Sequence, residues 1–99
     1  MIKLIRMRSG EDVVGEVTKE NEEFIDIKDP ATLMPMSGGA NNAVQMGMVP
    51  WQPFSKSKEF SVPRSWVVTV SEPADDLEDN YRRVYGSGIG VPPKKLLLS

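Results

Sequence analysis

The sequence contains no cysteine and no histidine. Without cysteine, the chain has no disulfide framework and no thiolate nucleophile. Without histidine, Ser-His-Asp triads and histidine-based acid–base catalysis are excluded. Since these two residues are also the usual zinc ligands, an ordinary zinc site is not expected. No serine, tyrosine or lysine is grouped with a base in the sequence either, so we expect no enzyme activity, no metal and no cofactor.

The sequence is also poor in net charge and in long apolar runs. A formal net charge of −2 over 99 residues argues against a protein whose whole surface binds nucleic acid, but it is compatible with a local basic groove. No apolar run approaches the ~20 residues of a membrane span. The N-terminus, MIKLIRMRSG, lacks the apolar centre of a signal peptide. We therefore expect one cytoplasmic domain over residues 1–99, which oligomerisation would help to stabilise.

Residues 1–70 show the alternation of apolar and polar side chains that is typical of β-strands. Apolar residues occur on both faces of the first strand, which predicts a strand covered on both sides, as in a small barrel. Asp29-Pro30 either ends or bends the third strand. The expected strands are Ile2–Arg8, Asp12–Lys19, Phe24–Lys28 with an extended continuation over Ala31–Met36, Ala43–Trp51, and Phe60–Val70.

Two glycines stand out in this β region. Gly10 lies in the turn Ser9-Gly10-Glu11, where a positive φ is accessible to glycine. Gly15 lies inside the second strand, where glycine is normally unfavourable. Such a glycine marks a sharp bend, a bulge or a close approach of two backbones, so both glycines are expected to serve geometry rather than ligand binding.

Residues 71–86 change to helical spacing. Ser71 is the expected N-cap and Gly86 the expected C-terminal stop. Aspartates near the start and arginines near the end would complement the helix dipole. We expect a loop over residues 37–42 and a loose tail over residues 87–99. The apolar stripe of the helix consists of Leu77, Tyr81, Val84 and Tyr85.

The pattern Gly-x-x-Val-x-Gly, formed by Gly10, Val13 and Gly15 within Leu4–Ile27, resembles the first motif of the Sm/LSm family. The apolar residues that follow Arg64 resemble part of the second motif. The chain is most similar to small Sm-like proteins of marine cyanophage type. The features that carry this last likeness are Pro50-Trp51, Tyr81 and Gly86 to Ile89.

The resemblance implies a fold and an assembly. The fold is mostly β, with one bent five-stranded antiparallel sheet closing toward a barrel, a C-terminal helix and no N-terminal helix. The assembly is a homo-oligomeric ring of about five to seven subunits, in which the fourth strand of one subunit pairs with the fifth strand of the next.

Asn21, Phe24 and Arg64 are the candidate RNA-binding residues. Phe24, with Asn21 beside it in the second turn, could stack on a base, or it could simply pack in the sheet. Arg64 offers a planar donor fork for a base or phosphate, or it could be a solvated loop arginine. Lys56 and Lys58 are expected to be solvated loop charges only. By the resemblance, the base-binding asparagine of the family falls at about Ile25, whose side chain cannot bond a base.

Two functions remain open. The first is an RNA-binding ring that acts as a scaffold or chaperone for single-stranded RNA. The second is a structural or protein-interaction ring without RNA binding, which Ile25 and the net acidic charge favour. Salt dependence discriminates between them, because binding driven by phosphate contacts weakens steeply with salt.

Overall fold

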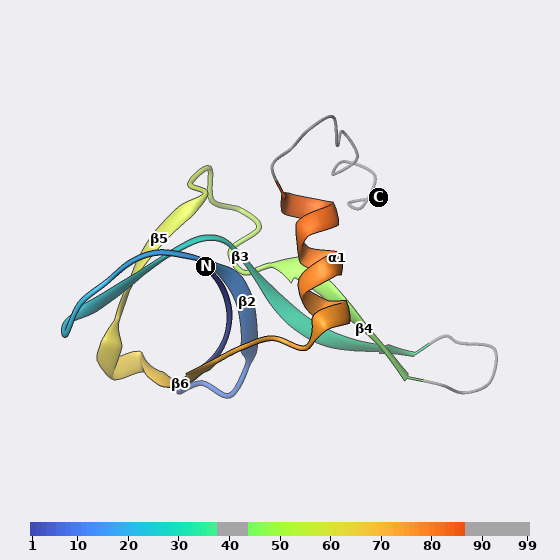
Figure 1. Cartoon of the computed structure of the whole chain (residues 1–99), viewed down its shortest axis with the longest axis horizontal. Coiled ribbons are helices and arrows are strands. Elements are labelled where there is room, and N and C mark those ends of the chain that lie inside the picture. The colour runs from blue at the N-terminus through green and yellow to red at the C-terminus, as the bar shows by residue number, and fades with distance from the viewer. Residues whose placement is uncertain (38–43, 87–99) are drawn as a thin grey trace.

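The described part of the chain folds into one bent antiparallel sheet and one helix (Figure 1). The structure is a computed structural model that describes residues 1–37 and 44–86. The expected loop at 37–42, apart from Ser37, and the expected tail over 87–99 lie outside the described residues. The elements are β1 (Ile2–Met7), β2 (Asp12–Glu20), β3 (Phe24–Ser37), β4 (Val44–Pro50), β5 (Glu59–Pro63), the 3-10 turn η1 (Arg64–Trp66), β6 (Val67–Ser71) and α1 (Asp75–Tyr85).

The strands curve around a small open barrel. Their order is β4-β3-β2-β1-β6, and β5 pairs with the same β3 that pairs with β4. Figure 1 shows α1 outside the barrel, beside β3 and β4. The prediction of a mostly β fold with a bent antiparallel sheet and one C-terminal helix is therefore confirmed.

The strand expected over Phe60–Val70 is two strands, which raises the number in the described residues from the expected five to six. Pro63 ends β5, and the chain then passes through η1 before β6 begins. The break arises because β5 pairs with β3 whereas β6 pairs with β1, so the chain crosses from one side of the barrel to the other. The alternation of apolar residues continues across η1 and hides this crossing in the sequence.

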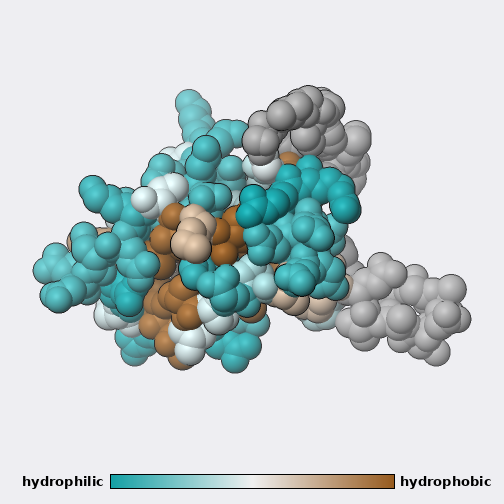
Figure 2. Space-filling model, in the orientation of Figure 1, coloured by the Kyte–Doolittle hydropathy of each residue, from teal (hydrophilic) through white to brown (hydrophobic). Residues whose placement is uncertain are grey.

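Two apolar clusters cover the two faces of the sheet. One fills the barrel and consists of Ile5, Met7, Val13, Ile25, Ile27 and Val62. The other lies under α1 and consists of Ile2, Val14, Ala31 and Tyr81, with Leu77 and Tyr85 packed against it. Since β1 contributes to both clusters, the prediction that it is covered on both sides is confirmed. Figure 2 shows the hydrophobic residues of the barrel surrounded by hydrophilic ones.

Gly15 lies at a bulge in β2. The register with β3 shifts between Val14 and Glu16. A Cβ atom at Gly15 would collide with Cγ2 of Ile27 and lie 3.3 Å from Cα of Pro30. The predicted close approach at Gly15 is confirmed. Gly10 has φ 103° and its N–H donates to the Met7 carbonyl (2.9 Å), which confirms the predicted turn.

Asp29 and Pro30 bend β3 without ending it. β3 is continuous over 14 residues, and Asp29 has φ 50°, in the left-handed region. The bend is held from two directions. The single hydroxyl proton of Tyr81 on α1 is shared between the carbonyls of Lys28 and Asp29, which lie 3.0 and 2.9 Å from the Tyr81 oxygen. On the other side, the N–H of Trp51 donates to the Pro30 carbonyl (2.9 Å) and the N–H of Asp29 donates to the Lys58 carbonyl (2.6 Å).

The helix begins at Asp75, later than the sequence predicts. Ser71 is not its N-cap, because Ser71 is the last residue of β6 and pairs with Leu4 of β1. The observed N-cap is Ala74, which makes no side-chain capping bond. Gly86 follows the last helical residue, as expected, and its N–H donates to the Arg82 carbonyl (2.8 Å). The helix is therefore held mainly by its apolar stripe and by the bonds of Tyr81.

Stability is expected to fall at alkaline pH because of the tyrosines of α1. Burial, helped by the charge of Asp29, raises the pKa of Tyr81 above its ordinary value of 10.0, and burial also raises the pKa of Tyr85. When a pKa is higher in the folded state, its contribution is complete below the unfolded pKa and is lost as pH rises above it. The free energy of unfolding should therefore fall above pH ~10, by up to about 1.4 kcal/mol per pH unit for the buried Tyr81, with a smaller contribution from the more exposed Tyr85.

Urea unfolding measured across the alkaline range tests this expectation. Tyr81→Phe should lower stability at neutral pH by about 1–3 kcal/mol, because two carbonyls lose their donor, and should flatten the alkaline decline. An unchanged alkaline slope in Tyr81→Phe would show that other groups cause it.

Candidate nucleic-acid interface

The three candidate residues meet at one end of the barrel, although Arg64 is 40 positions away from Phe24. Phe24 lies opposite Pro63 in the register of β3 with β5. The N–H of Arg64 donates to the carbonyl of Glu23 (2.8 Å). The β2–β3 turn and the start of η1 are thus joined, and this junction is called here the β3–η1 rim, formed by residues 20–24 and 64–66.

Asn21 shapes the turn at this rim. Its Oδ1 accepts hydrogen bonds from the N–H groups of Glu23 and Phe24, each at 2.8 Å, and its own N–H donates to the Phe24 carbonyl (2.9 Å). Such a side-chain bond to the backbone two and three residues ahead fixes a turn. The side-chain amide nitrogen of Asn21 donates to none of the described residues, so it stays available to a ligand.

Phe24 and Ile25 face opposite sides of β3. Phe24 is 43% exposed, so packing in the sheet accounts for only part of its surface. Ile25 is fully buried in the barrel cluster. The position at which the resemblance expects a base-binding asparagine is therefore a core position in this chain, and Phe24 is the side chain that meets solvent.

Arg64 is held by Glu20, with which it forms an ion pair and a hydrogen bond. The two side chains are 37% and 46% exposed. At this exposure, solvent screening leaves such a pair worth only about 0–1 kcal/mol, so a ligand can exchange for Glu20 at small cost. Glu22 and Glu23 are also exposed, which makes the rim acidic apart from Arg64.

Two residues of the rim were missed in the sequence. Glu20 was assigned only to a polar turn, since nothing local shows that it pairs with Arg64. Trp66, at the other end of η1, is 41% exposed, and the guanidinium carbon of Arg8 lies 5.2 Å from its ring centroid. This cation–π contact holds the Trp66 ring, which gives the rim a second exposed aromatic side chain. The signal for it was a tryptophan two positions after Arg64, which the sequence placed in a continuous strand.

The rim combines an exposed aromatic ring, an arginine and an amide, which makes it the candidate surface for contact with bases. In residues 1–37 and 44–86, no three acidic side chains are grouped so as to hold a metal ion. None of the helical segments within those ranges has the length and apolar character of a membrane span. An exposed aromatic ring, a planar guanidinium and a free amide are the groups that stack on bases and bond to their edges.

Comparison with known proteins adds one finding. A family model described as "Sm_like domain" matches residues 4–82. This range runs from β1 into α1 and includes the whole β3–η1 rim. No curated protein matches the sequence.

Proposed function

The chain belongs to the Sm-like domain family, and from this membership we propose that it forms a homo-oligomeric ring that binds single-stranded RNA as a scaffold or chaperone. The observation that supports RNA binding is the meeting of Asn21, Phe24 and Arg64 at the β3–η1 rim. The proposal includes a cytoplasmic location, which for a protein of cyanophage type is the cytoplasm of the host cell.

The sheet supports ring assembly because the strands at its two edges, as far as the structure describes the chain, each pair with one strand only and leave their other side open. Within the described residues, β6 pairs only with β1, whereas β4 and β5 pair only with β3. β5 and β6 are both five residues long. The edge opposite β6 is formed by β4 and β5. Pairing of β6 in one subunit with this edge of the next would give both edges a hydrogen-bonded neighbour, and it would repeat around a ring of about five to seven subunits.

Assembly into a ring would also raise the affinity for RNA above that of a single rim. Each rim offers two exposed aromatic rings, Phe24 and Trp66, and one arginine, Arg64, and the acidic neighbours of Arg64 weaken attraction for phosphate. Repeating the rim in every subunit makes each further contact intramolecular, which raises avidity without new chemistry. We therefore expect stacking to dominate binding at this rim and the salt dependence there to be shallow.

Substitutions at the rim test the proposal. Phe24→Ala should weaken binding of a short U-rich RNA by about 5- to 150-fold, the range for losing one base–aromatic stack. Arg64→Ala should weaken it through loss of the guanidinium fork, whereas Glu20→Gln should strengthen it by up to about fivefold, because it frees Arg64. Fluorescence anisotropy with labelled RNA measures all three variants.

Arg83→Ala, an exposed arginine of α1, is the matched control and should bind as the unmodified protein does. If neither Phe24→Ala nor Arg64→Ala changed the affinity, the rim would not be the RNA site.

A ring that binds protein and not RNA is the second candidate. Two observations favour it: Ile25 is fully buried, and Glu20 neutralises Arg64. Native mass spectrometry with added U-rich RNA at low salt separates the two functions. A ring that carries RNA supports the first, and an intact ring that stays bare supports the second.

A further inference from the structure

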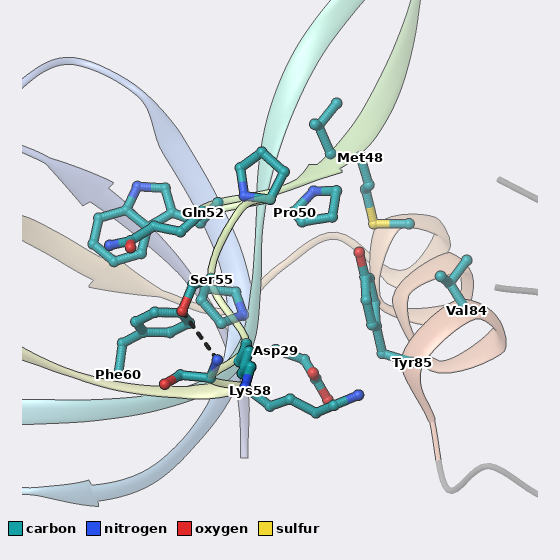
Figure 3. A pocket seen from close by; sticks show the side chains of 15 residues that line it. Asp29, Met48, Pro50, Gln52, Ser55, Lys58, Phe60, Val84 and Tyr85 are labelled. Carbon is teal, nitrogen blue, oxygen red and sulfur yellow. Dashed lines mark hydrogen bonds between the residues drawn. The ribbon is translucent and has the colours of Figure 1, made fainter. Parts of the chain in front are cut away.

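A groove of about 580 Å³ lies between α1 and the segment 51–58, which links β4 to β5. Figure 3 shows Val84 and Tyr85 of α1 on one side of it and Met48 and Pro50 of β4 on another. Residues of segment 51–58, including Lys56 and Lys58, form a further part of the lining, together with Asp29, Pro30 and Phe60. The groove and the rim lie at opposite ends of the paired strands β3 and β5. Phe24 pairs with Pro63 at the rim end, and Lys28 pairs with Glu59 at the groove end. Four residue steps of about 3.3 Å make this separation roughly 13 Å.

Segment 51–58 has a defined shape. Its first N–H and its last carbonyl are bonded to Pro30 and Asp29, at the bend of β3. Inside it, the N–H of Ser55 donates to the Gln52 carbonyl, and the N–H of Ser57 donates to Oγ of Ser55, both at 3.0 Å. The two ends of segment 51–58 are therefore held by the residues that form the bend of β3, and this fixes the position of the segment as a wall of the groove.

Two aromatic side chains that line the groove, Trp51 and Tyr85, are held by neighbouring side chains, and a third, Phe54, is exposed beside it. Trp51 packs edge-to-face on Phe60, with ring centroids 5.7 Å apart, and its Nε1–H donates to Glu11 (3.1 Å). Tyr85 lies against Tyr81, with centroids 5.0 Å apart. Phe54, in the middle of segment 51–58, is 100% exposed. One exposed apolar side chain is not by itself a sign of a ligand. The aromatic side chains Trp51 and Tyr85 that line the groove, together with its lysines, are what indicate a surface for a ligand with flat faces.

The groove is locally cationic in a chain with net negative charge. Lys56 and Lys58 line it, and neither forms an ion pair with any residue in 1–37 or 44–86. Asp29 is the acidic residue that lines it. This balance is opposite to that of the rim, where glutamates surround Arg64.

We propose that this groove binds one nucleotide unit of a single-stranded nucleic acid, with the base against the lining aromatic side chains Trp51 or Tyr85 and the phosphate at Lys56 and Lys58. Phe54 does not line the groove, but its exposed ring lies in the same segment and offers a stacking face for an adjacent base of the strand. The inference rests on the proposed function, to which it adds a second contact of different chemistry. Lysines beside aromatic rings form the usual surface for a single strand, whereas an acidic peptide has no need of flat aromatic walls. In this proposal both sites stack on bases, and the groove also holds backbone phosphate, which the acidic rim holds poorly.

The two tryptophans of the chain allow the two sites to be observed separately. Trp66→Phe leaves Trp51 as a reporter of the groove, and Trp51→Phe leaves Trp66 as a reporter of the rim. With U-rich RNA, the fluorescence of Trp51 should change in a saturable way. Lys56→Gln with Lys58→Gln should reduce the slope of log affinity against log salt by up to about 1.4, which is two phosphate contacts at ~0.7 each. Phe54→Ala should weaken binding about 5- to 150-fold.

Lys19→Gln with Arg83→Gln removes the same charge elsewhere and should leave the Trp51 response unchanged.

If the fluorescence of Trp51 does not change, while Trp66 responds and the Lys56→Gln, Lys58→Gln pair has no effect, the groove is overturned and the proposed function is kept. A Trp51 response that depends on the lysines, with Trp66 silent and Arg64→Ala without effect, supports the groove and overturns the rim. Equal responses to free uridine monophosphate or to poly-glutamate overturn a nucleic-acid strand as the occupant. If a tryptophan variant does not fold, photocrosslinking of thiouridine-labelled RNA to segment 51–58 of the unmodified chain is the deciding measurement.

Discussion

Replacement of Gly15 by alanine is expected to lower the free energy of unfolding by about 3 kcal/mol, a large share of the roughly 5–15 kcal/mol typical of a domain. The new Cβ would overlap Cγ2 of Ile27, with the Lys28 carbonyl 3.4 Å away behind it. Ile27 is fully buried and cannot rotate away without disturbing the barrel cluster. The strands would have to separate where β3 bends.

Urea unfolding of a double-mutant cycle with Ile27→Leu measures this penalty. Leucine has no branch at Cβ, so it removes the atom that faces Gly15 at similar volume, and the cost of Gly15→Ala should fall by roughly half in that background. Gly10→Ala is the control: apart from residues 9–11 themselves, no atom lies within 4 Å of the methyl group that alanine would add, and the φ of 103° should cost about 1–2 kcal/mol regardless of residue 27. A Gly15→Ala protein as stable as the original would show that the bend tolerates a side chain.

The first half of the fold could be predicted because its determinants are local. The two sides of β1 and β2 follow from residue alternation, and Gly15 is conspicuous because glycine is unfavourable inside a strand. The turn at Gly10 is equally local. These features confirm that a two-residue period and two glycines specify a bent hairpin.

The second half was harder because pairing partners are remote. The sequence predicted one strand over Phe60–Val70, whereas the pairing of β5 with β3 and of β6 with β1 requires a break after Pro63. Likewise, Ser71 has the side chain of an N-cap, but its place opposite Leu4 commits it to the sheet. Local preference was overridden by tertiary pairing in both cases.

Three residues of the candidate rim were selected from the sequence, but its other members, Glu20 and Trp66, and its geometry were not. Sequence resemblance selected Asn21, Phe24 and Arg64, whereas the register that brings Phe24 beside Pro63 is visible only in the fold. The ion pair of Glu20 with Arg64 likewise joins two remote segments. Lys56 and Lys58, expected to be solvated charges only, gain a further interpretation because the bend at Asp29 places them beside a groove.

Replacement of Val68 by glutamate is expected to dissociate the proposed ring while leaving the subunit folded. The register of β6 with β1 shifts at this point, where Met7 pairs with Val67 and Arg6 with Thr69, so Val68 is the extra residue of the bulge. Its side chain is 56% exposed and lies outside both core clusters. A surface substitution of this kind changes subunit stability by only about 0.5 kcal/mol.

The effect on assembly should be much larger, because strand addition at β6 would remove the new carboxylate from water beside a neighbouring strand. A desolvated and unpaired charge of this kind should weaken each interface by about 100-fold or more, and charged side chains on edge strands are a known block to pairing. Native mass spectrometry and sedimentation should therefore find monomers with unchanged circular dichroism. Phe54→Glu, which exchanges another exposed apolar side chain for the same charge outside every strand, should keep the ring. Rings in both variants would assign assembly to a surface other than β6, and monomers in both would assign the effect to charge alone, so only the difference between them ties the ring to this edge.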